Sequence, residues 1–459
     1  MKALALIEHV DRELDLVCLL KLLLKARRGI DLEIANFYAD APLTLARPAP
    51  RAVLTPFFYA VEDVVLKDYV EAWPGARFVN LAWEQVFYPT HEAMKAPRDK
   101  FTRKKVTHLA WSRSFTDYLA RNGVVDDRSR LVGHALYRLY GEPYRRYFGS
   151  RDALARAHGL DPAKPWVFVP ENYRWAFFTD AKLTKLGRRG LEAEALFEMR
   201  GYCRRSLAAL MRWCDALART GEVEVIFRPR PATSLAEIGG FSRGVFGDAD
   251  PAYRLIKDGS AREWVIASDV VASSYSTVLI EGALAGKRLV RAAPEPTPEG
   301  LRYDWCDLVP AAETQDVFLA ACLAADAPGD EALRDWAEAM FFPSGDPVDR
   351  LVEAVAAEVE AAYAGPAPTA AKNGMPMPVW LRIVAPMLGP VPRHRLFERF
   401  VPGYFFNRET HEKDLFGQAE VAARVARWRR TLAAVPAAWT AARPPPAPAA
   451  VPLGQRGRV

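Results

Sequence analysis

The sequence predicts an α/β fold of two domains, each a parallel sheet covered by helices, which face one another across a cleft and are followed by a helical C-terminal extension. Two observations predict it. Apolar runs of strand length alternate with helical patterns from residue 3 onward, a rhythm typical of parallel sheets with helices on both faces. The rhythm restarts at residue 166 after a polar helical stretch, so each half has the size of a nucleotide-binding domain.

The composition agrees with a folded protein of this kind. Of the 459 residues, 50% are hydrophobic and 26% are charged, as in ordinary globular proteins. The five cysteines are odd in number and scattered, so they favour a reducing compartment and predict neither disulfides nor a zinc cluster. The apolar run at the start is short and soon interrupted by charge, unlike a signal peptide. We therefore expect a cytoplasmic protein without a metal site.

The first domain is expected to span residues 1–150. Its strands are expected at residues 3–7, 32–37, 53–58, 78–82, 106–111 and 130–133, and its first helix at 13–26. The second domain is expected to span residues 151–363. Its strands are expected at residues 166–170, 223–227, 263–267, 270–272 and 288–292, and its helices at 191–220, 277–285 and from about 331 to 363. For the glycine-rich stretch at 239–247 neither a strand nor a helix is predicted.

The basic charge of the chain is concentrated near its C-terminus. Residues 364–459 carry 14 Lys or Arg against 5 Asp or Glu, whereas residues 1–363 carry 48 against 51. We expect a Pro/Ala-rich linker at 364–378, a basic amphipathic helical segment at 379–434 and a disordered Ala/Pro-rich tail at 435–459.

A basic appendage on a near-neutral body argues against nucleic-acid binding. It fits contact with an anionic membrane surface, and thus a peripheral place on the inner membrane. The segment has too few consecutive apolar residues to cross a bilayer. The alternative is that its aromatic side chains pack on the folded body or on a partner subunit. These side chains include Trp380, Phe397, Phe400 and Phe405.

The sharpest motif lies where a predicted strand meets a predicted helix. Four hydroxyl residues, Ser273, Ser274, Ser276 and Thr277, lead into the helix that carries Glu281. Unpaired N–H groups and the helix dipole attract anions at a helix N-terminus, so this turn is a candidate phosphate site. Simple helix capping by a single Ser or Thr is the alternative.

A second motif, Arg228, Arg230 and Pro231, ends a neighbouring predicted strand. Proline prevents further ladder pairing, so both guanidinium groups are expected to point toward the cleft. A guanidinium binds phosphate or carboxylate with two parallel hydrogen bonds. Solvated arginines on a loop are the alternative.

Two polar clusters follow predicted strands of the first domain: Glu8, His9, Arg12 and Glu13 after the first strand, and Glu84 with Gln85 after the fourth. Ligands of open α/β sheets bind beyond the carboxyl ends of the strands, so both clusters are expected to face the cleft. An acid-rich helix start, or a solvent-exposed Glu, is the alternative. Of the other histidines, His91 and His134 lie near predicted strand ends.

A family resemblance rests on Ile7-Glu8-His9, Arg12-Glu13-Leu14, Trp83-Glu84-Gln85, His108 to Trp111, Pro170-Glu171-Asn172, the Arg-Pro run and Ser273 to Glu281. With these motifs the sequence resembles the bacterial surface carbohydrate biosynthesis proteins. Those are similar to GT-B glycosyltransferases and more distantly to Kdo transferases, bacterial sialyltransferases and CDP-glycerol glycerophosphotransferases. The resemblance spans residues 1 to about 310.

The resemblance implies a GT-B-like pair of Rossmann-like domains. It also implies sugar transfer from a nucleotide donor, with a CMP-linked acidic sugar such as Kdo favoured, to a surface polysaccharide or lipid-linked glycan. Ser273-Ser274 or Ser276-Thr277 matches the phosphate motif of the relatives, whereas Arg230 stands where a histidine would precede Pro231. Arginine keeps its charge near neutral pH and cannot act as an acid there.

The expected site follows from these motifs. Nucleotide and phosphate are expected to contact Arg228, Arg230, Pro231, Ser273, Ser274, Ser276, Thr277 and Glu281, with Arg12, Glu13, Gln85 and Asn172 lining the cleft. Fixed positive groups stabilise a leaving phosphate, so neither a metal nor a cofactor besides the nucleotide-sugar substrate is expected. The catalytic candidates are Glu8, Glu84 and His9, with one of the carboxylates as the base that takes the acceptor proton.

Two alternatives to sugar transfer stay open. One is transfer of a polyol phosphate from a CDP donor. The other is a non-catalytic role, in which the chain binds a glycan or nucleotide within a polysaccharide assembly system.

Overall fold

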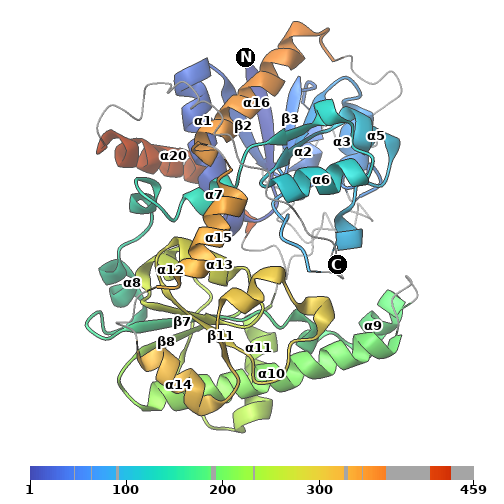
Figure 1. The fold of residues 1–459 in the computed structure, drawn as a ribbon. Coiled ribbons are helices and arrows are strands. Elements are labelled where there is room, and N and C mark those ends of the chain that lie inside the picture. Colours follow the sequence, from blue (N-terminus) through green and yellow to red (C-terminus); the bar gives the residue numbers. More distant parts are fainter. Residues whose placement is uncertain are drawn as a thin grey trace, which may run out of the picture.

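The computed structural model describes residues 1–45, 47–63, 65–88, 92–187, 193–230, 233–324, 329–343, 345–368 and 414–435. Within these ranges the chain forms two six-stranded sheets, one above the other in Figure 1, and every strand pair is parallel. We call the part that carries β1–β6 the first domain and the part that carries β7–β12 the second domain. The predicted α/β class with two Rossmann-like domains is confirmed.

The first sheet has the strand order β2-β1-β3-β4-β5-β6. Its strands are β1 (Lys2–Ile7), β2 (Asp31–Asn36), β3 (Ala52–Thr55), β4 (Arg77–Asn80), β5 (Thr107–Ala110) and β6 (Ser129–Leu131), and its helices include α1 (Asp15–Arg28), α2 (Ala41–Leu45), α3 (Leu66–Ala72), α5 (Lys100–Lys105), α6 (Arg113–Arg121) and α7 (Ala135–Arg138). Successive side chains of a strand point to opposite faces. Accordingly Ala3, Ala5 and Ile7 join the core under α1, while Leu4 and Leu6 join the core under α3. Both faces of this sheet are therefore buried, as parallel sheets require.

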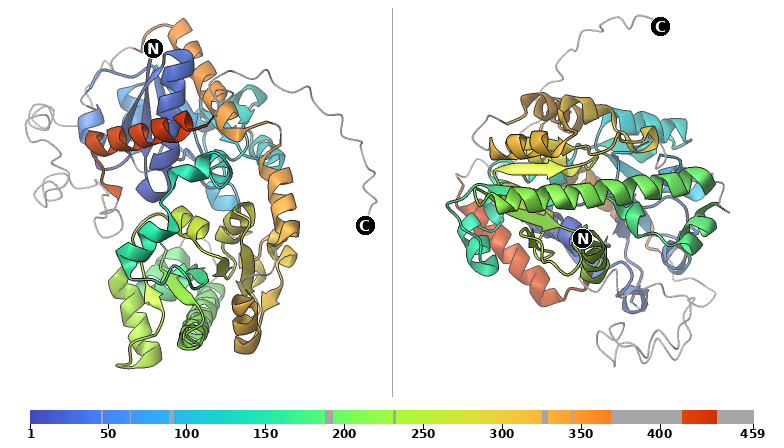
Figure 2. Two further views of the ribbon diagram at one scale, coloured as in Figure 1. Left: turned by 90° about the vertical axis from the view of Figure 1, so that its left-hand side faces the viewer. Right: turned by 90° about the horizontal axis from the view of Figure 1, so that it is seen from below.

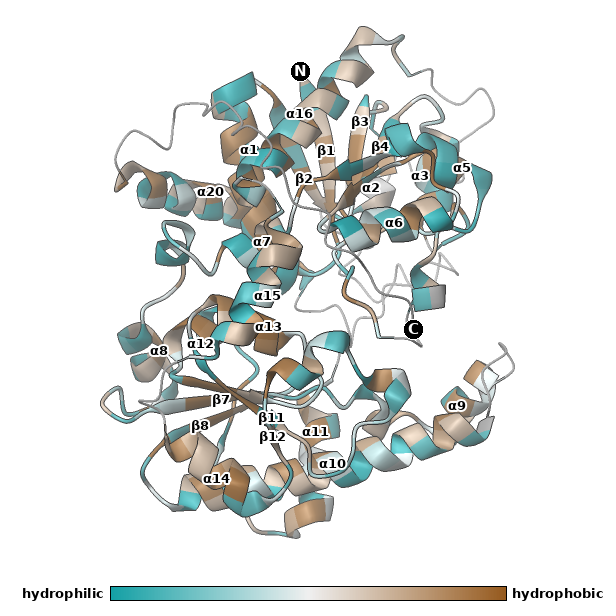
Figure 3. Ribbon diagram, in the orientation of Figure 1, coloured by the Kyte–Doolittle hydropathy of each residue, from teal (hydrophilic) through white to brown (hydrophobic). Residues whose placement is uncertain are grey.

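The second sheet has the order β12-β11-β10-β7-β8-β9. Its strands are β7 (Trp166–Pro170), β8 (Glu224–Arg228), β9 (Arg254–Leu255), β10 (Val270–Ser273), β11 (Arg288–Ala292) and β12 (Ala311–Ala312). Its helices are α8 (Arg151–His158), α9 (Asp180–Gly187), α10 (Ala193–Arg219), α11 (Leu235–Phe246), α12 (Ala261–Ala267), α13 (Val278–Leu284) and α14 (Gln315–Leu323). Figure 3 shows the apolar strands β7 and β8 enclosed by helices that carry hydrophilic residues.

One segment predicted as a strand is in fact helical, and so is most of the glycine-rich stretch for which no element was predicted. The strand predicted at 263–267 is wrong, because these residues belong to helix α12. A capping box starts that helix: the Ser260 hydroxyl accepts the N–H of Glu263, whose side chain accepts the N–H of Ser260. The stretch at 239–247 lies mostly within α11, which Ser234 and Glu237 begin in the same way. Short apolar or glycine-rich runs do not reveal a helical period by themselves.

The helix expected from about 331 to 363 is in fact two helices, α15 (Glu331–Phe341) and α16 (Pro347–Ala364). Asp346 caps α16 by accepting the N–H of Val348 at 2.8 Å, and Pro347 occupies the first helical position, where a missing N–H is tolerated. Helix α15 packs on α13 of the second domain, and α16 packs on α1, β3 and β4 of the first (Figure 2). The break lets the chain return across the cleft.

A C-terminal segment, residues 414–435, also lies on the first domain. Its helix α20 (Gln418–Ala433) packs against α1. The indole N–H of Trp428 donates to the Asp15 carbonyl at 2.8 Å, and the Trp428 ring stacks on Tyr147 with centroids 3.9 Å apart. Of the roles expected for the basic appendage, packing on the folded body therefore applies to this segment.

The rest of the appendage lies outside the described residues. This concerns 369–413 and 436–459, and with them Trp380, Phe397, Phe400, Phe405 and the expected tail. Contact with a membrane surface thus stays a prediction. Among the helices of the described ranges, none has the length and apolar character needed to span a bilayer.

The return of α16 depends on a buried carboxylate. Glu358 of α16 pairs with Arg77 of β4 and accepts a hydrogen bond from the Thr107 hydroxyl at 3.0 Å. We expect Glu358→Ala to lower the free energy of unfolding by about 3 kcal/mol, because it leaves Arg77 and the buried hydroxyl without their partner. Urea unfolding measures the loss. The control is Glu360→Ala, an exposed position of the same helix, and an equal loss in both variants would contradict this role.

Candidate functional site

A cavity of about 440 Å³ lies between the two sheets, with walls from both domains. It opens where the carboxyl ends of the strands converge, the usual ligand position in α/β folds. Eight of the residues expected in the site line it: Arg12, Glu84, Gln85, Asn172, Arg230, Ser276, Thr277 and Glu281. Six others are not among the residues that line it: Glu8, His9, Glu13, Arg228, Ser273 and Ser274. Pro231 lies outside the described residues.

The prediction that both guanidinium groups of the Arg-Pro run point into the cleft is wrong for Arg228. Its side chain is 4% exposed and donates to the carbonyls of Asp258 at 2.8 Å and Gly259 at 2.6 Å. It also pairs with Asp11 of the first domain at 3.6 Å. Burial lowers the pKa of Arg228, although Asp11 opposes this. Arg228 therefore holds the loop before α12, and only Arg230 of the pair reaches the cavity.

The serine-rich turn divides its hydroxyls between structure and cavity. Ser273 donates to the Pro170 carbonyl at 2.7 Å and so ties β10 to β7, and the buried Ser274 hydroxyl lies against that of Tyr173. Ser276 accepts the N–H of Val278 at 3.3 Å, whereas the side chain of Thr277, the N-cap residue of α13, makes no capping hydrogen bond. The expectation that all four hydroxyls meet a ligand is thus wrong for the first two, whereas Ser276 and Thr277 line the cavity.

Glu281 does not fit the phosphate-binding role expected of it. It accepts a hydrogen bond from the Tyr140 hydroxyl, and burial raises the pKa of its carboxyl, although Tyr140 and Arg262 oppose this. A carboxylate would repel a phosphate. The Tyr140 contact instead joins α13 to the chain between the two domains.

The floor of the cavity contains two residues that the sequence did not single out as ligand contacts. The Arg262 side chain is buried, packs over the Tyr140 and Phe148 rings, and has two guanidinium nitrogens, Nε and Nη1, without a hydrogen-bond partner among the described residues. His134 lies between the rings of Trp111 and Tyr137, with centroids 3.5 and 3.6 Å away. Burial, with the charge of Arg262, lowers the pKa of His134 well below its usual range, so its imidazole is neutral.

A cationic cluster of Arg174, Lys182 and Arg230 lines the second-domain wall. Burial and the charge of Arg230 lower the pKa of Arg174, and burial with both arginines lowers that of Lys182. None of the three forms an ion pair with a carboxylate of the described residues. Arg174 follows Asn172 shortly after the end of β7, so its position near a strand end could have indicated a cavity residue from the sequence. Lys182 on α9 offered none.

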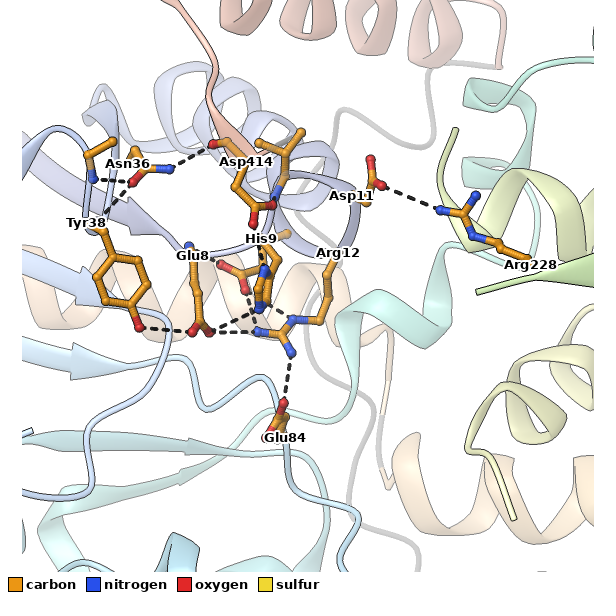
Figure 4. A network of polar contacts seen from close by, with 12 residues as sticks. Glu8, His9, Asp11, Arg12, Asn36, Tyr38, Glu84, Arg228 and Asp414 are labelled. Atoms are coloured by element: carbon orange, nitrogen blue, oxygen red, sulfur yellow. Dashed lines mark hydrogen bonds and ion pairs between the residues drawn. The ribbon is translucent and has the colours of Figure 1, made fainter. Parts of the chain in front are cut away.

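In the first domain one cation, Arg12, is shared by three carboxylates (Figure 4). Arg12 donates to Glu13 at 2.7 Å, to Glu84 at 3.1 Å and to Glu8 at 3.2 Å. Burial alone would lower the pKa of Arg12. The charges of the three carboxylates outweigh burial, so the pKa lies above its ordinary value. Glu8 also accepts the Tyr38 hydroxyl at 3.2 Å. The strand-end cluster therefore forms as predicted, but Glu8 and Glu13 are turned toward Arg12 rather than toward the cavity.

A strained turn places Glu84 at the cavity. Ala82, just after β4, has the positive φ of 48° that non-glycine residues rarely adopt. The Asn80 side chain accepts the Ala82 N–H at 2.9 Å, and Gln85 donates to the carbonyls of Ala82 and Leu109 at 3.1 and 2.7 Å. Gln85 therefore acts mainly as an anchor of this turn, and Glu84, about half exposed, is left facing the cavity.

No protein-family model matches the sequence, and no curated protein does either. Solved structures do match. They include S. aureus MnaA with UDP (TM-score 0.50, 9% identity, 80% of this chain and 99% of that one). They also include the Methanocaldococcus jannaschii UDP-GlcNAc 2-epimerase with UDP-GlcNAc and UDP (0.50, 9%, 77% and 99%) and Anabaena Alr3699/HepE with UDP-glucose (0.43, 13%, 79% and 100%). At such identities the likeness concerns the fold, which is the predicted GT-B arrangement.

The Arg12 cluster makes a pH-dependent prediction. In Arg12→Met the three carboxylates face one another without their shared cation, and Glu13, whose pKa burial already raises, loses the charge that lowers it. Folded-state pKa values above the unfolded ones mean that stability falls as pH rises. We expect a loss of about 3 kcal/mol at pH 8 and a smaller one at pH 5, measured by urea unfolding. Arg113→Met, at an exposed site, is the control. Equal losses at both pH values would count against this prediction.

Proposed function

We propose that the chain binds a nucleotide sugar in the cavity and transfers its sugar to a hydroxyl acceptor. The observation that carries this proposal is the cationic cluster of Arg174, Lys182 and Arg230. Burial lowers the pKa of both Arg174 and Lys182, and the charge of the neighbouring arginines lowers it further, so the three like charges lie in a partly desolvated wall where they repel one another. A diphosphate relieves this repulsion, because its oxygens accept charge-assisted hydrogen bonds from all three groups.

The surroundings of the cluster support a nucleotide sugar over a simple anion. The cavity combines these cations with aromatic side chains, among them Trp83, Trp111 and Tyr303, which offer flat apolar faces to a base or a sugar ring. Two structures that share the fold contain UDP. A uridine or cytidine diphosphate is therefore the first ligand to test, with CMP-linked Kdo as the more specific donor that the family resemblance implies.

The reaction also needs charge stabilisation at the leaving group. When the bond between sugar and phosphate breaks, negative charge develops on the phosphate oxygen, and fixed cations next to it lower the barrier without moving. In the proposal Arg174 and Arg230 supply this positive charge, and the hydroxyls of Ser276 and Thr277 supply hydrogen-bond donors. Of the two carboxylates expected as the base, Glu84 lines the cavity and Glu8 does not.

The binding prediction concerns the two arginines. We expect Arg174→Gln and Arg230→Gln each to weaken binding of UDP or CDP by roughly 10- to 100-fold, since one charge-assisted hydrogen bond contributes about 1.5 to 3 kcal/mol. Isothermal titration calorimetry measures this. Arg243→Gln, an exposed residue of α11 away from the cavity wall, is the control. Unchanged affinity in both cavity variants would show that the phosphates bind elsewhere.

The proposal also includes a metal-independent reaction. The cations already supply positive charge to the leaving phosphate, so we expect EDTA to leave the release of nucleotide from the bound donor unchanged. Restoration of lost activity by Mg²⁺ or Mn²⁺ would refute this part.

The same assay separates sugar transfer from the alternatives. Release of nucleotide that depends on a glycan acceptor indicates a glycosyltransferase, release from CDP-glycerol indicates polyol phosphate transfer, and binding without release indicates a non-catalytic role.

A further inference from the structure

A buried arginine of the second domain reaches the floor of the cavity. Arg262 lies in the first turn of α12, at the end of the second domain that faces the first (Figure 1). The residue is 6% exposed and lines the cavity. Its guanidinium carbon lies 5.5 Å from the Tyr140 ring centroid and 5.3 Å from that of Phe148. Both rings belong to the stretch of chain between β6 and β7, so ring faces rather than water surround much of this cation.

The guanidinium of Arg262 has no acceptor within the part of the chain that the structure describes. Its Nε and Nη1 atoms are buried without a hydrogen-bond partner, and it forms no ion pair with a carboxylate there. A buried cation loses its hydration, and this loss is costly unless acceptors replace the water. The buried Arg228, in contrast, donates to two backbone carbonyls and pairs with Asp11. Arg262 therefore keeps at the cavity a hydrogen-bonding capacity that the described protein groups do not use.

The groups around Arg262 do not neutralise it. Glu281 lies beyond ion-pair distance and accepts the Tyr140 hydroxyl instead. Burial raises the pKa of the Glu281 carboxyl, although Tyr140 and the charge of Arg262 oppose this, so the neutral form of Glu281 is favoured more than that of an exposed glutamate. Burial, with the charge of Arg262, lowers the pKa of His134, whose Nδ1 is also buried without a partner. The floor of the cavity thus combines an unbalanced positive charge with a neutral imidazole.

Arg262 is separate from the cationic cluster of Arg174, Lys182 and Arg230. Burial lowers the pKa of Arg174 and of Lys182, and the charges that act on them as well come from within the cluster and from residues other than Arg262. The cavity therefore has two cationic positions, one proposed for the diphosphate and one without an assigned ligand. A ligand fills both positions when it brings a second anionic group apart from the diphosphate.

We propose that Arg262 binds the carboxylate of an acidic sugar, such as a hexuronate, in the same cavity as the nucleotide diphosphate. This inference rests on the proposed function and narrows its substrate class. A carboxylate carries one charge, as the guanidinium does, and it accepts two parallel hydrogen bonds from that group. A phosphate dianion would place two negative charges near the Glu281 carboxyl, and one guanidinium does not balance them.

The rings near Arg262 suit the sugar that carries this carboxylate. His134 lies between Trp111 and Tyr137, with ring centroids 3.5 and 3.6 Å away, and all three residues line the cavity. This stack of rings gives the floor an apolar surface on which a sugar ring can pack. A sugar hydroxyl also offers a hydrogen-bond partner to Nδ1 of His134. The carboxylate belongs either to the donor sugar or to the acceptor sugar, and two ligand pairs separate these sources.

In each pair the two ligands differ by a carboxylate in place of a hydroxymethyl group. For the donor, isothermal titration calorimetry compares the affinity of the full-length protein for UDP-glucuronate with that for UDP-glucose. For the acceptor, ligand-observed NMR compares methyl glucuronide with methyl glucoside, with and without saturating UDP. We expect one pair to show a preference of roughly 10- to 100-fold for its acidic member, the contribution of one charge-assisted contact. That pair identifies the source of the carboxylate, and equal affinities within both pairs overturn the inference.

Variants assign the preference to Arg262. We expect Arg262→Gln to lose the preference but to bind UDP and the neutral ligand as the wild type does, because the cationic cluster holds the diphosphate. Arg262→Lys keeps the charge without the planar guanidinium and is expected to retain part of the preference. Arg254→Gln, at an exposed position of the second domain outside the cavity lining, is the matched control and keeps it. A preference that survives in Arg262→Gln, or an equal loss of affinity for UDP and the acidic ligand, overturns the inference.

The carboxylate site and the proposed function fail in different ways. If the wild-type protein binds neither UDP nor a UDP-sugar, the proposed function is refuted, and the glycoside pair measured without UDP decides the role of Arg262. If UDP binds but neither ligand pair shows a preference, the proposed function stands and the carboxylate site is refuted.

Discussion

The buried guanidinium of Arg12 organises the first-domain side of the cleft. It joins carboxylates that follow two different strands, Glu8 and Glu13 after β1 and Glu84 after β4, and each needs a cation to remain at these positions. Without a shared cation, three carboxylates within hydrogen-bonding reach of one point would repel one another or take up protons. The direction of Glu84 and the environment of His9 both depend on this one side chain.

The two walls of the cavity differ in how their charges are balanced. On the first-domain wall, Glu84 pairs with Arg12, which also lines the cavity, and with Lys95. On the second-domain wall, the cationic cluster has no such partners among the described residues. Anions are therefore attracted more strongly to the second-domain wall of the cavity than to the first-domain wall.

The end of the chain is part of this arrangement. Helix α16 crosses from the second domain to the first, where Glu358 pairs with Arg77 of β4 and accepts a hydrogen bond from Thr107 of β5. Helix α20 packs against α1, and Trp428 stacks on Tyr147. Both contacts attach C-terminal parts of the sequence to the first domain. The basic appendage was interpreted from its charge, and the part that the structure describes attaches through one of its cations as well as an indole: Arg424 pairs with the Asp15 carboxylate, and Trp428 donates to the Asp15 carbonyl.

The sequence by itself determined the two parallel sheets and the strand ends at which the site lies. Periodicity is a local property, and parallel topology gathers all carboxyl ends of a sheet at one edge, so the sequence predicted the strand ends that carry Glu84, Arg230, Ser276 and Thr277, which line the cavity. The tertiary structure alone decided which side chains turn inward. Arg228 and Arg230 stand two residues apart. Arg228 nevertheless donates to the carbonyls of residues 258–259, whereas Arg230 lines the cavity, because the acceptors around each side chain select its orientation. Asp414, a partner of His9, lies 405 positions away, and no local pattern encodes a contact that only the folded chain brings together.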